Sequence, residues 1–116
     1  MAAAPLAGKR VLITQADAFM GPVLCEVFAE QGAEVVASTE SLREADAPAA
    51  LVARCGAIDV VVANLALPAP STPAVDVTDD EWAEVFGCLV DPLPRLCRAV
   101  LPQMVARRAG KILLMG

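Results

Sequence analysis

Four short apolar runs, separated by segments of helical character, constrain the fold of this chain most. The runs are residues 10–14, 34–38, 58–63 and 111–115. Nearly unbroken apolar strands are typical of parallel sheets that helices cover on both faces. Because strand and helix alternate along the chain, the sequence predicts an α/β fold with a doubly wound parallel sheet and right-handed crossovers.

Helices are predicted over residues 21–31, 48–55 and 78–109. The first has a proline in its first turn and a glycine directly after its end, which are common helix boundaries. Thr78 and Glu81 form a capping-box pattern at the start of the third helix. Three prolines predict a bend or break in that helix; they are Pro92, Pro94 and Pro102.

Composition and charge exclude several classes of protein. A chain of 116 residues predicts one small domain. The net charge of -5 argues against nucleic-acid binding. Four cysteines without a CxxC pair, and no histidine, predict no metal site. Neither a signal peptide nor an apolar run of membrane-spanning length is present, so we expect a cytoplasmic protein without membrane contact.

The order and spacing of several short motifs resemble the first half of a short-chain dehydrogenase/reductase. The motifs are residues 9–14 (KRVLIT), 59–64 (DVVVAN), 101–104 (LPQM) and 110–112 (GKI). The resemblance implies a Rossmann-like sheet and a domain over residues 1–116 that lacks the half carrying the catalytic residues. Residues 38–59 are too few for the usual helix, strand and helix, so we expect one edge strand to be reduced.

The nucleotide-binding loop departs from the pattern of that superfamily. The superfamily has T-G-x-x-x-G-x-G, and here Gln15 and Phe19 stand at the first two glycines. Glycines there let the backbone approach the pyrophosphate, and Asp17 adds a negative charge beside a helix start that would otherwise attract phosphate. Thr39 stands where NAD-dependent members have an acid. These departures predict that the protein uses no cofactor.

Halohydrin dehalogenases resemble short-chain dehydrogenases but bind no nucleotide, and their loop is similar to the one in this chain. Thr14, Phe19 and Gly21 match their loop position for position. The resemblance implies a pocket for substrate and halide formed by Thr14, Phe19, Gly21, Asn64 and Leu65. It also implies a cofactor-independent lyase that interconverts halohydrins and epoxides and assembles as a homo-oligomer, a homotetramer, through the helix over residues 78–109.

The resemblance places the catalytic serine, tyrosine and arginine after Gly116, and this chain contains no tyrosine. We therefore expect no catalytic residue within it and no independent function. An NAD(P)-dependent oxidoreductase with a degenerate loop is the alternative, with NAD or NADP held by Thr14, Gly21, Thr39 and Asn64. A non-catalytic half-domain that pairs with another chain is a third possibility.

Overall fold

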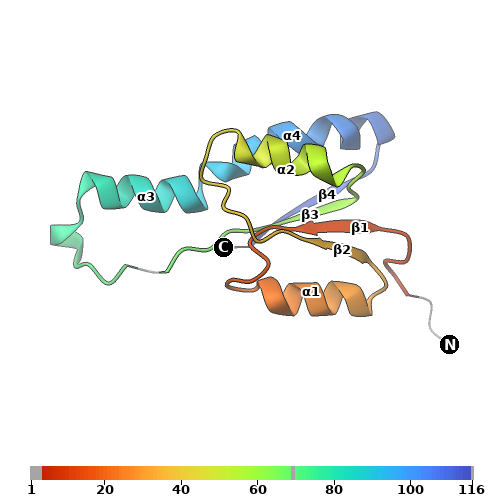
Figure 1. The fold of residues 1–116 in the computed structure, drawn as a ribbon, viewed down its shortest axis with the longest axis horizontal. Coiled ribbons are helices and arrows are strands. Elements are labelled where there is room, and N and C mark those ends of the chain that lie inside the picture. Colours follow the sequence, from red (N-terminus) through yellow and green to blue (C-terminus); the bar gives the residue numbers. More distant parts are fainter. Residues whose placement is uncertain (1–3, 69, 116) are drawn as a thin grey trace.

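The computed structural model describes residues 4–68 and 70–115, and its centre is a parallel sheet of four strands (Figure 1). The strands are β1 (Arg10–Ile13), β2 (Glu34–Ala37), β3 (Val60–Asn64) and β4 (Lys111–Met115). They lie in the order β2-β1-β3-β4, and every neighbouring pair is parallel. This confirms the predicted fold class and all four predicted strands to within two residues at either end.

The connections run in opposite directions from β1. The chain crosses from β1 to β2 on one side, and then returns past β1 to β3 on the other side. The carboxyl ends of β1 and β3 therefore meet at a topological switch point, where open α/β sheets bind their ligands. No strand lies between β2 and the next helix, as the short segment 38–59 predicted, and within the described residues β2 lies at the edge of the sheet.

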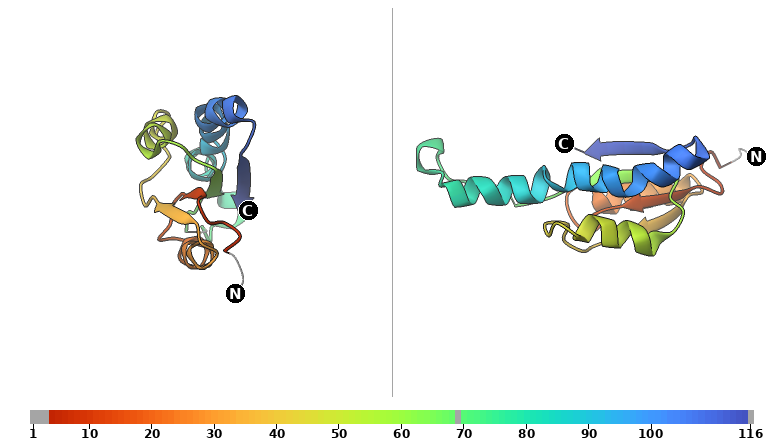
Figure 2. Two further views of the ribbon diagram at one scale, coloured as in Figure 1. Left: turned by 90° about the vertical axis from the view of Figure 1, so that its right-hand side faces the viewer. Right: turned by 90° about the horizontal axis from the view of Figure 1, so that it is seen from above.

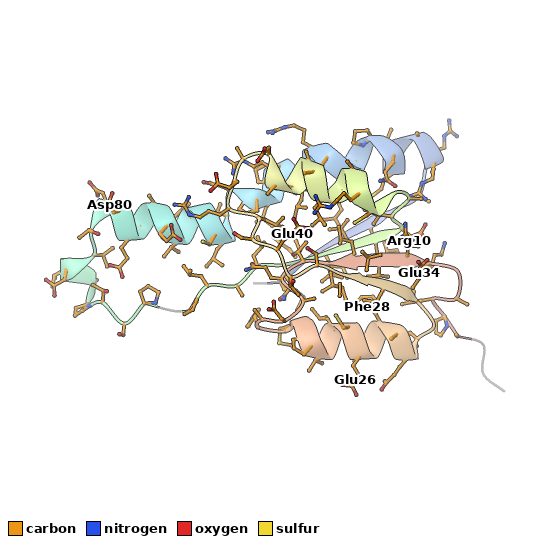
Figure 3. All side chains as sticks on the ribbon, viewed as in Figure 1. Arg10, Glu26, Phe28, Glu34, Glu40 and Asp80 are labelled. Carbon is orange, nitrogen blue, oxygen red and sulfur yellow. The ribbon has the colours of Figure 1, made fainter. Side chains whose placement is uncertain are left out.

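Helices cover both faces of the sheet. The helix α1 (Gly21–Glu30) packs on one face, while α2 (Ala47–Cys55) and α4 (Pro92–Arg107) pack on the other (Figures 1 and 2). Figure 3 shows Phe28 of α1 directed toward the sheet and Glu26 directed away from it. Alternate residues of the central strands enter the two cores, because successive side chains of a strand point to opposite faces.

The segment predicted as one helix over residues 78–109 forms two helices. The helix α3 (Asp79–Leu89) ends at Leu89 with Val90 as its C-cap, and α4 begins at Pro92. Proline lacks an N–H for the helical hydrogen bond but suits a first helical turn, so Pro92 ends one helix and starts the next. Pro102 stays inside α4.

The helix α3 projects beyond the carboxyl ends of the strands, preceded by a short 3-10 helix at Ala74–Asp76 (Figure 2). This projection gives the chain extents of 56 × 31 × 19 Å. The predicted capping box is formed only in part. The Thr78 hydroxyl accepts the Glu81 N–H at 3.1 Å, but the Glu81 carboxylate accepts a hydrogen bond from Thr72 at 2.7 Å.

The apolar strand β4 is less buried than its sequence predicts. A run such as residues 112–115 is typical of a strand covered on both faces, yet Leu113 is 43% exposed and Leu114 is 60% exposed. Within the residues that the structure describes, β4 pairs only with β3 and lies at the edge of the sheet. None of the described helices is both long enough and apolar enough to cross a membrane.

Candidate functional site

Two fully buried polar side chains join the carboxyl ends of β1 and β3. The Thr14 hydroxyl donates to the Asn64 carbonyl at 2.8 Å. The Asn64 amide donates to the carbonyl oxygens of Gln15 at 3.0 Å and Ala18 at 2.9 Å. Asn64 Oδ1 is buried and has no hydrogen-bond partner among the described residues. Thr14 and Asn64 thus hold the loop after β1 against β3, and their bonding groups point into the protein.

The loop after β1 keeps a glycine-like backbone without its first two glycines. Gln15 has a φ of 43° and Phe19 a φ of 51°, both in the left-handed region. This conformation is unfavourable by about 1–2 kcal/mol for a residue with a Cβ. The chain therefore adopts the turns that glycine would permit while it places an amide and a benzyl group where the superfamily has none.

The side chain of Gln15 reaches across the switch point to the segment after β3. Its Oε1 accepts the backbone N–H of Ala66 at 2.7 Å, and its Nε2 donates to the Ala66 carbonyl at 3.2 Å. Gln15 was expected only to add bulk to the turn. Its pairing with Ala66 was missed because no sequence pattern reports which backbone groups a loop glutamine will reach.

An apolar cavity opens beside this pair, with a volume of about 280 Å³. Phe19 forms one wall and is 61% exposed, so it is not a core aromatic. The other lining residues come from the segment after β3 and from the ends of α3 and β4; they are Leu65, Ala66, Leu67, Leu89 and Met115. None of the described residues that line the cavity has a titratable side chain, so these walls offer shape and apolar surface rather than acid–base chemistry.

The structure brings together only two of the five residues predicted to form the pocket. Phe19 and Leu65 line the cavity, whereas Thr14 and Asn64 lie buried beneath it. Gly21 is buried at the start of α1, where a Cβ would lie 2.4 Å from the Ala16 carbonyl oxygen. Leu89 and Met115 also line the cavity and were not predicted, because their approach depends on the positions of α3 and β4.

Thr39, predicted to bind the cofactor under the alternative hypothesis, lines a different and more polar cavity. This second cavity has a volume of about 360 Å³ and lies between β2 and α2. Glu40 and Arg54 form an ion pair there, and Figure 3 shows Glu40 in the segment that follows β2. Thr39 and Phe19 therefore do not share one cavity.

The start of α1 offers few free donors to a phosphate group. The Gly21 N–H donates to the Ala18 carbonyl at 2.8 Å, and Pro22 has no N–H. Asp17 is exposed in the loop just before the helix and adds a negative charge. Helix starts bind anions through free N–H groups and the helix dipole, and in α1 the N–H of Gly21 is already bonded and that of Pro22 is missing. Together with the side chains at positions 15 and 19, this loop does not reproduce the glycine cradle of a dinucleotide site.

The cysteine thiols do not supply a reactive group to the apolar cavity. Burial raises the pKa of the thiols of Cys25, Cys55 and Cys88, so they are protonated at neutral pH, and none of them lines the apolar cavity. Among residues 4–68 and 70–115, no group of three His, Cys, Asp or Glu side chains could hold a metal ion. What the site provides is an apolar pocket with a fixed backbone wall.

The family model of the short chain dehydrogenases matches residues 44–116, more than half of the chain, and the chain belongs to that family. The 3-oxoacyl-(acyl-carrier-protein) reductase of Vibrio harveyi is 27% identical over 96% of this chain and 55% of its own length. The 2-keto-3-deoxy-L-fuconate dehydrogenase of Xanthomonas campestris is 34% identical over 96% of this chain and 43% of its own. The chain thus spans about half the length of these relatives, whose names are those of oxidoreductases.

Solved structures share the fold. One described as a dehalogenation enzyme has a TM-score of 0.84 and 26% identity, covering 97% of this chain and 55% of that chain. The L-sorbose reductase of Gluconobacter frateurii, complexed with NADPH and L-sorbose, has a TM-score of 0.85 and covers 97% of this chain and 54% of that chain. At 22% identity the second likeness shows the fold alone.

Proposed function

We propose that this chain forms the binding half of a cofactor-independent halohydrin dehalogenase. The observation that carries the proposal is that Gln15 and Phe19 adopt left-handed backbone conformations that favour glycine, while the Gln15 side chain bonds to Ala66 and the Phe19 side chain lines the cavity. The cavity beside Phe19 suits a small halohydrin or epoxide, and an aromatic wall suits a weakly hydrated halide. The similarity to a solved dehalogenation enzyme supports this assignment.

The proposed reaction needs a base that this chain does not supply. The substrate hydroxyl loses its proton to the base, the resulting alkoxide forms a carbon–oxygen bond to the neighbouring carbon, and the halide leaves with the electron pair of the carbon–halogen bond. The resemblance assigns the proton transfer to a tyrosine beside an arginine, and substrate positioning to a serine. We place these three residues in the half of the protein that this chain does not span.

A second candidate is the NAD(P)-dependent oxidoreductase. The names of the relatives favour it, since they are a reductase and a dehydrogenase, and the family model is that of the short chain dehydrogenases. That match covers residues 44–116 and does not include the altered loop at residues 14–21. The site favours the lyase and the relatives favour the oxidoreductase, so the two candidates call for a direct comparison of activities.

The lyase consumes only the halohydrin, whereas the oxidoreductase also consumes a nucleotide, so one assay separates the two functions. The whole protein is incubated with a short vicinal bromoalcohol, and bromide release is followed without any added nucleotide. We expect bromide release, and we expect Phe19→Gly to reduce it because the pocket loses its aromatic wall. Reduction of a ketone that depends on NADPH, without bromide release, would contradict the lyase and establish the oxidoreductase.

We further propose that the protein assembles as a homo-oligomer through the segment 78–109, and that it is cytoplasmic. The assembly is supported by α3, which projects from the sheet and leaves Trp82 exposed. Trp82 packs against Phe86 with the ring centroids 4.9 Å apart, so the two form one aromatic surface on that helix. A second copy of the same helix is the partner that we propose for this surface.

A further inference from the structure

The pairing of Gln15 with Ala66 suggests a role that the halide pocket does not explain. Ala66 is the second residue after β3, so its backbone N–H and carbonyl lie just beyond the end of the strand and have no strand partner among the described residues. The Gln15 carboxamide carries one donor and one acceptor, in the same arrangement as a peptide group. It bonds to both backbone groups of this one residue, at 2.7 and 3.2 Å.

Without Gln15, the two backbone groups of Ala66 would be open to solvent or to a ligand. Unpaired N–H and carbonyl groups of a partly buried residue need a partner from solvent or from a ligand. With Gln15 in place, both groups of Ala66 are occupied from within the chain. A ribose hydroxyl or a phosphate oxygen that approached this edge would have to displace the glutamine amide.

The two hydrogen bonds between the Gln15 side chain and the Ala66 backbone, which we call the clamp, also fix one wall of the cavity. Ala66 lies between Leu65 and Leu67, and all three line the apolar cavity opposite Phe19. The backbone of Gln15 is itself held, because its carbonyl accepts the Asn64 amide at 3.0 Å. The wall is therefore tied to the loop after β1 through two side chains, from Gln15 and from Asn64.

We propose that Gln15 is a positioning residue that closes the former nucleotide cleft and sets the wall of the cavity. It acts through Ala66 and does not contact substrate. The site then accepts a small ligand that is largely apolar, and it rejects ligands that need backbone hydrogen bonds at this edge. The nature of that ligand rests on the proposed function, whereas the clamp on Ala66 does not depend on it.

Hydrogen exchange of the Ala66 amide, measured by NMR on the full chain, tests the clamp. In Gln15→Gly we expect this exchange to quicken at least tenfold, while the amides of β1 and β3 keep their protection. Glycine suits the positive φ at this position, so this variant loses the bonds without added backbone strain. Gln15→Glu keeps an acceptor for the Ala66 N–H, and we expect it to retain most of the protection.

Gln103 provides a matched control, because its amide makes a similar pair of bonds elsewhere. Its Oε1 accepts the Ile58 N–H at 2.8 Å, and its Nε2 donates to the Gly56 carbonyl at 3.1 Å. In Gln103→Leu the Ile58 amide should exchange faster and the Ala66 amide should not. Unchanged exchange at Ala66 in Gln15→Gly, with a clear response at Ile58 in the control, would overturn the clamp.

The proposal that Gln15 closes the nucleotide cleft is tested separately, by measuring the binding of NADH. Adding Gln15→Gly to Phe19→Gly should strengthen NADH binding at least tenfold over Phe19→Gly alone, and adding Gln103→Leu should not. If Phe19→Gly and the double variant Phe19→Gly with Gln15→Gly bind NADH with equal affinity, the closing role is refuted. Micromolar NADH binding by the unaltered protein would instead contradict the proposed function, so the two failures are distinguishable.

Discussion

In the loop after β1, the space around each Cβ atom determines which positions can carry a residue other than glycine. Gln15 and Phe19 have room for side chains at the switch point, where one side chain bonds to Ala66 and the other lines the cavity. Gly21 has no such space, since a Cβ there would lie 2.4 Å from the Ala16 carbonyl oxygen. The loop therefore keeps only the glycine that the packing of α1 against the sheet requires.

The substitution Gly21→Ala should be strongly destabilising. The atoms that its Cβ meets belong to the Ala16 backbone, which cannot move without shifting the loop, and we expect a loss of about 3 kcal/mol. Gly8→Ala is the control, because no atom lies within 4 Å of its Cβ and only the φ of 80° is unfavourable. We expect it to cost about 1 kcal/mol. Urea denaturation gives both values, and an equal or larger loss at Gly8 would contradict this explanation.

At the scale of the element, α3 is held to the rest of the chain by few side chains. Arg43, in the segment before α2, forms an ion pair with Glu84 at 2.6 Å and lies 3.6 Å from the Cβ position of Gly87. The Cys88 thiol also hydrogen-bonds to Glu84, at 3.4 Å. Arg43 therefore joins the projecting α3 to the segment before α2, and Leu89 at the end of α3 lines the cavity.

The attachment of α3 should weaken in acid. The hydrogen bond from Arg43 lowers the pKa of Glu84 below its ordinary value of 4.5. A carboxylate with a lowered folded-state pKa contributes stability above its unfolded pKa, and that contribution is lost as the pH falls through the folded value. We therefore expect Arg43→Met to be less stable than the unaltered chain at pH 7, with the difference shrinking as the pH falls below 4.5.

Denaturation curves of both proteins at neutral and acid pH measure this difference. Arg98→Met on α4 is the control, since Arg98 is exposed and makes no ion pair among the residues described by the structure. A difference between Arg43→Met and the unaltered chain that stays constant with pH would show that the guanidinium acts through packing alone.

The elements themselves were largely predictable from the sequence, and the exceptions have physical causes. Apolar runs predicted the four strands because the presence of a strand follows from the local pattern. The break before Pro92 followed from the chemistry of proline, but its direction, which sends α3 away from the sheet, did not. The capping box failed in part because Thr72, nine residues before Glu81, supplies a competing donor. Burial of β4 was overestimated because it depends on neighbours outside the strand.

The candidate site was less predictable than the fold. Phe19 and Leu65 line one cavity near the switch point, where the motif positions put them, because the position of a motif fixes where its loop lies on the sheet. Thr14 and Asn64 were also placed there, but they bond inward to the backbone rather than toward the cavity. The contributions of Leu89 and Met115 come from elements that approach only in the folded chain, so no local pattern indicates them.

At the scale of the whole molecule, a four-stranded layer carries one long projection with an aromatic surface. Trp82 is 60% exposed and Val75 in the preceding turn is 92% exposed, which is unusual for large apolar side chains. If a second copy covers this surface, Trp82→Glu should shift the protein toward a smaller species in analytical ultracentrifugation. Val27→Glu, at an exposed apolar position on α1, is the control and should leave the mass unchanged. The same mass for all three proteins would contradict assembly through α3.

The central claim is that the switch point holds a small ligand and no dinucleotide, and titration with NADH and NADPH tests it most directly. The whole protein is titrated in a calorimeter, with nucleotide fluorescence as a second signal. Phe19 lines the cavity and the Gln15 side chain bonds to both backbone groups of Ala66, and under our proposal we predict no binding of either nucleotide at micromolar concentration. Saturable binding of NADH or NADPH in the micromolar range would contradict the account.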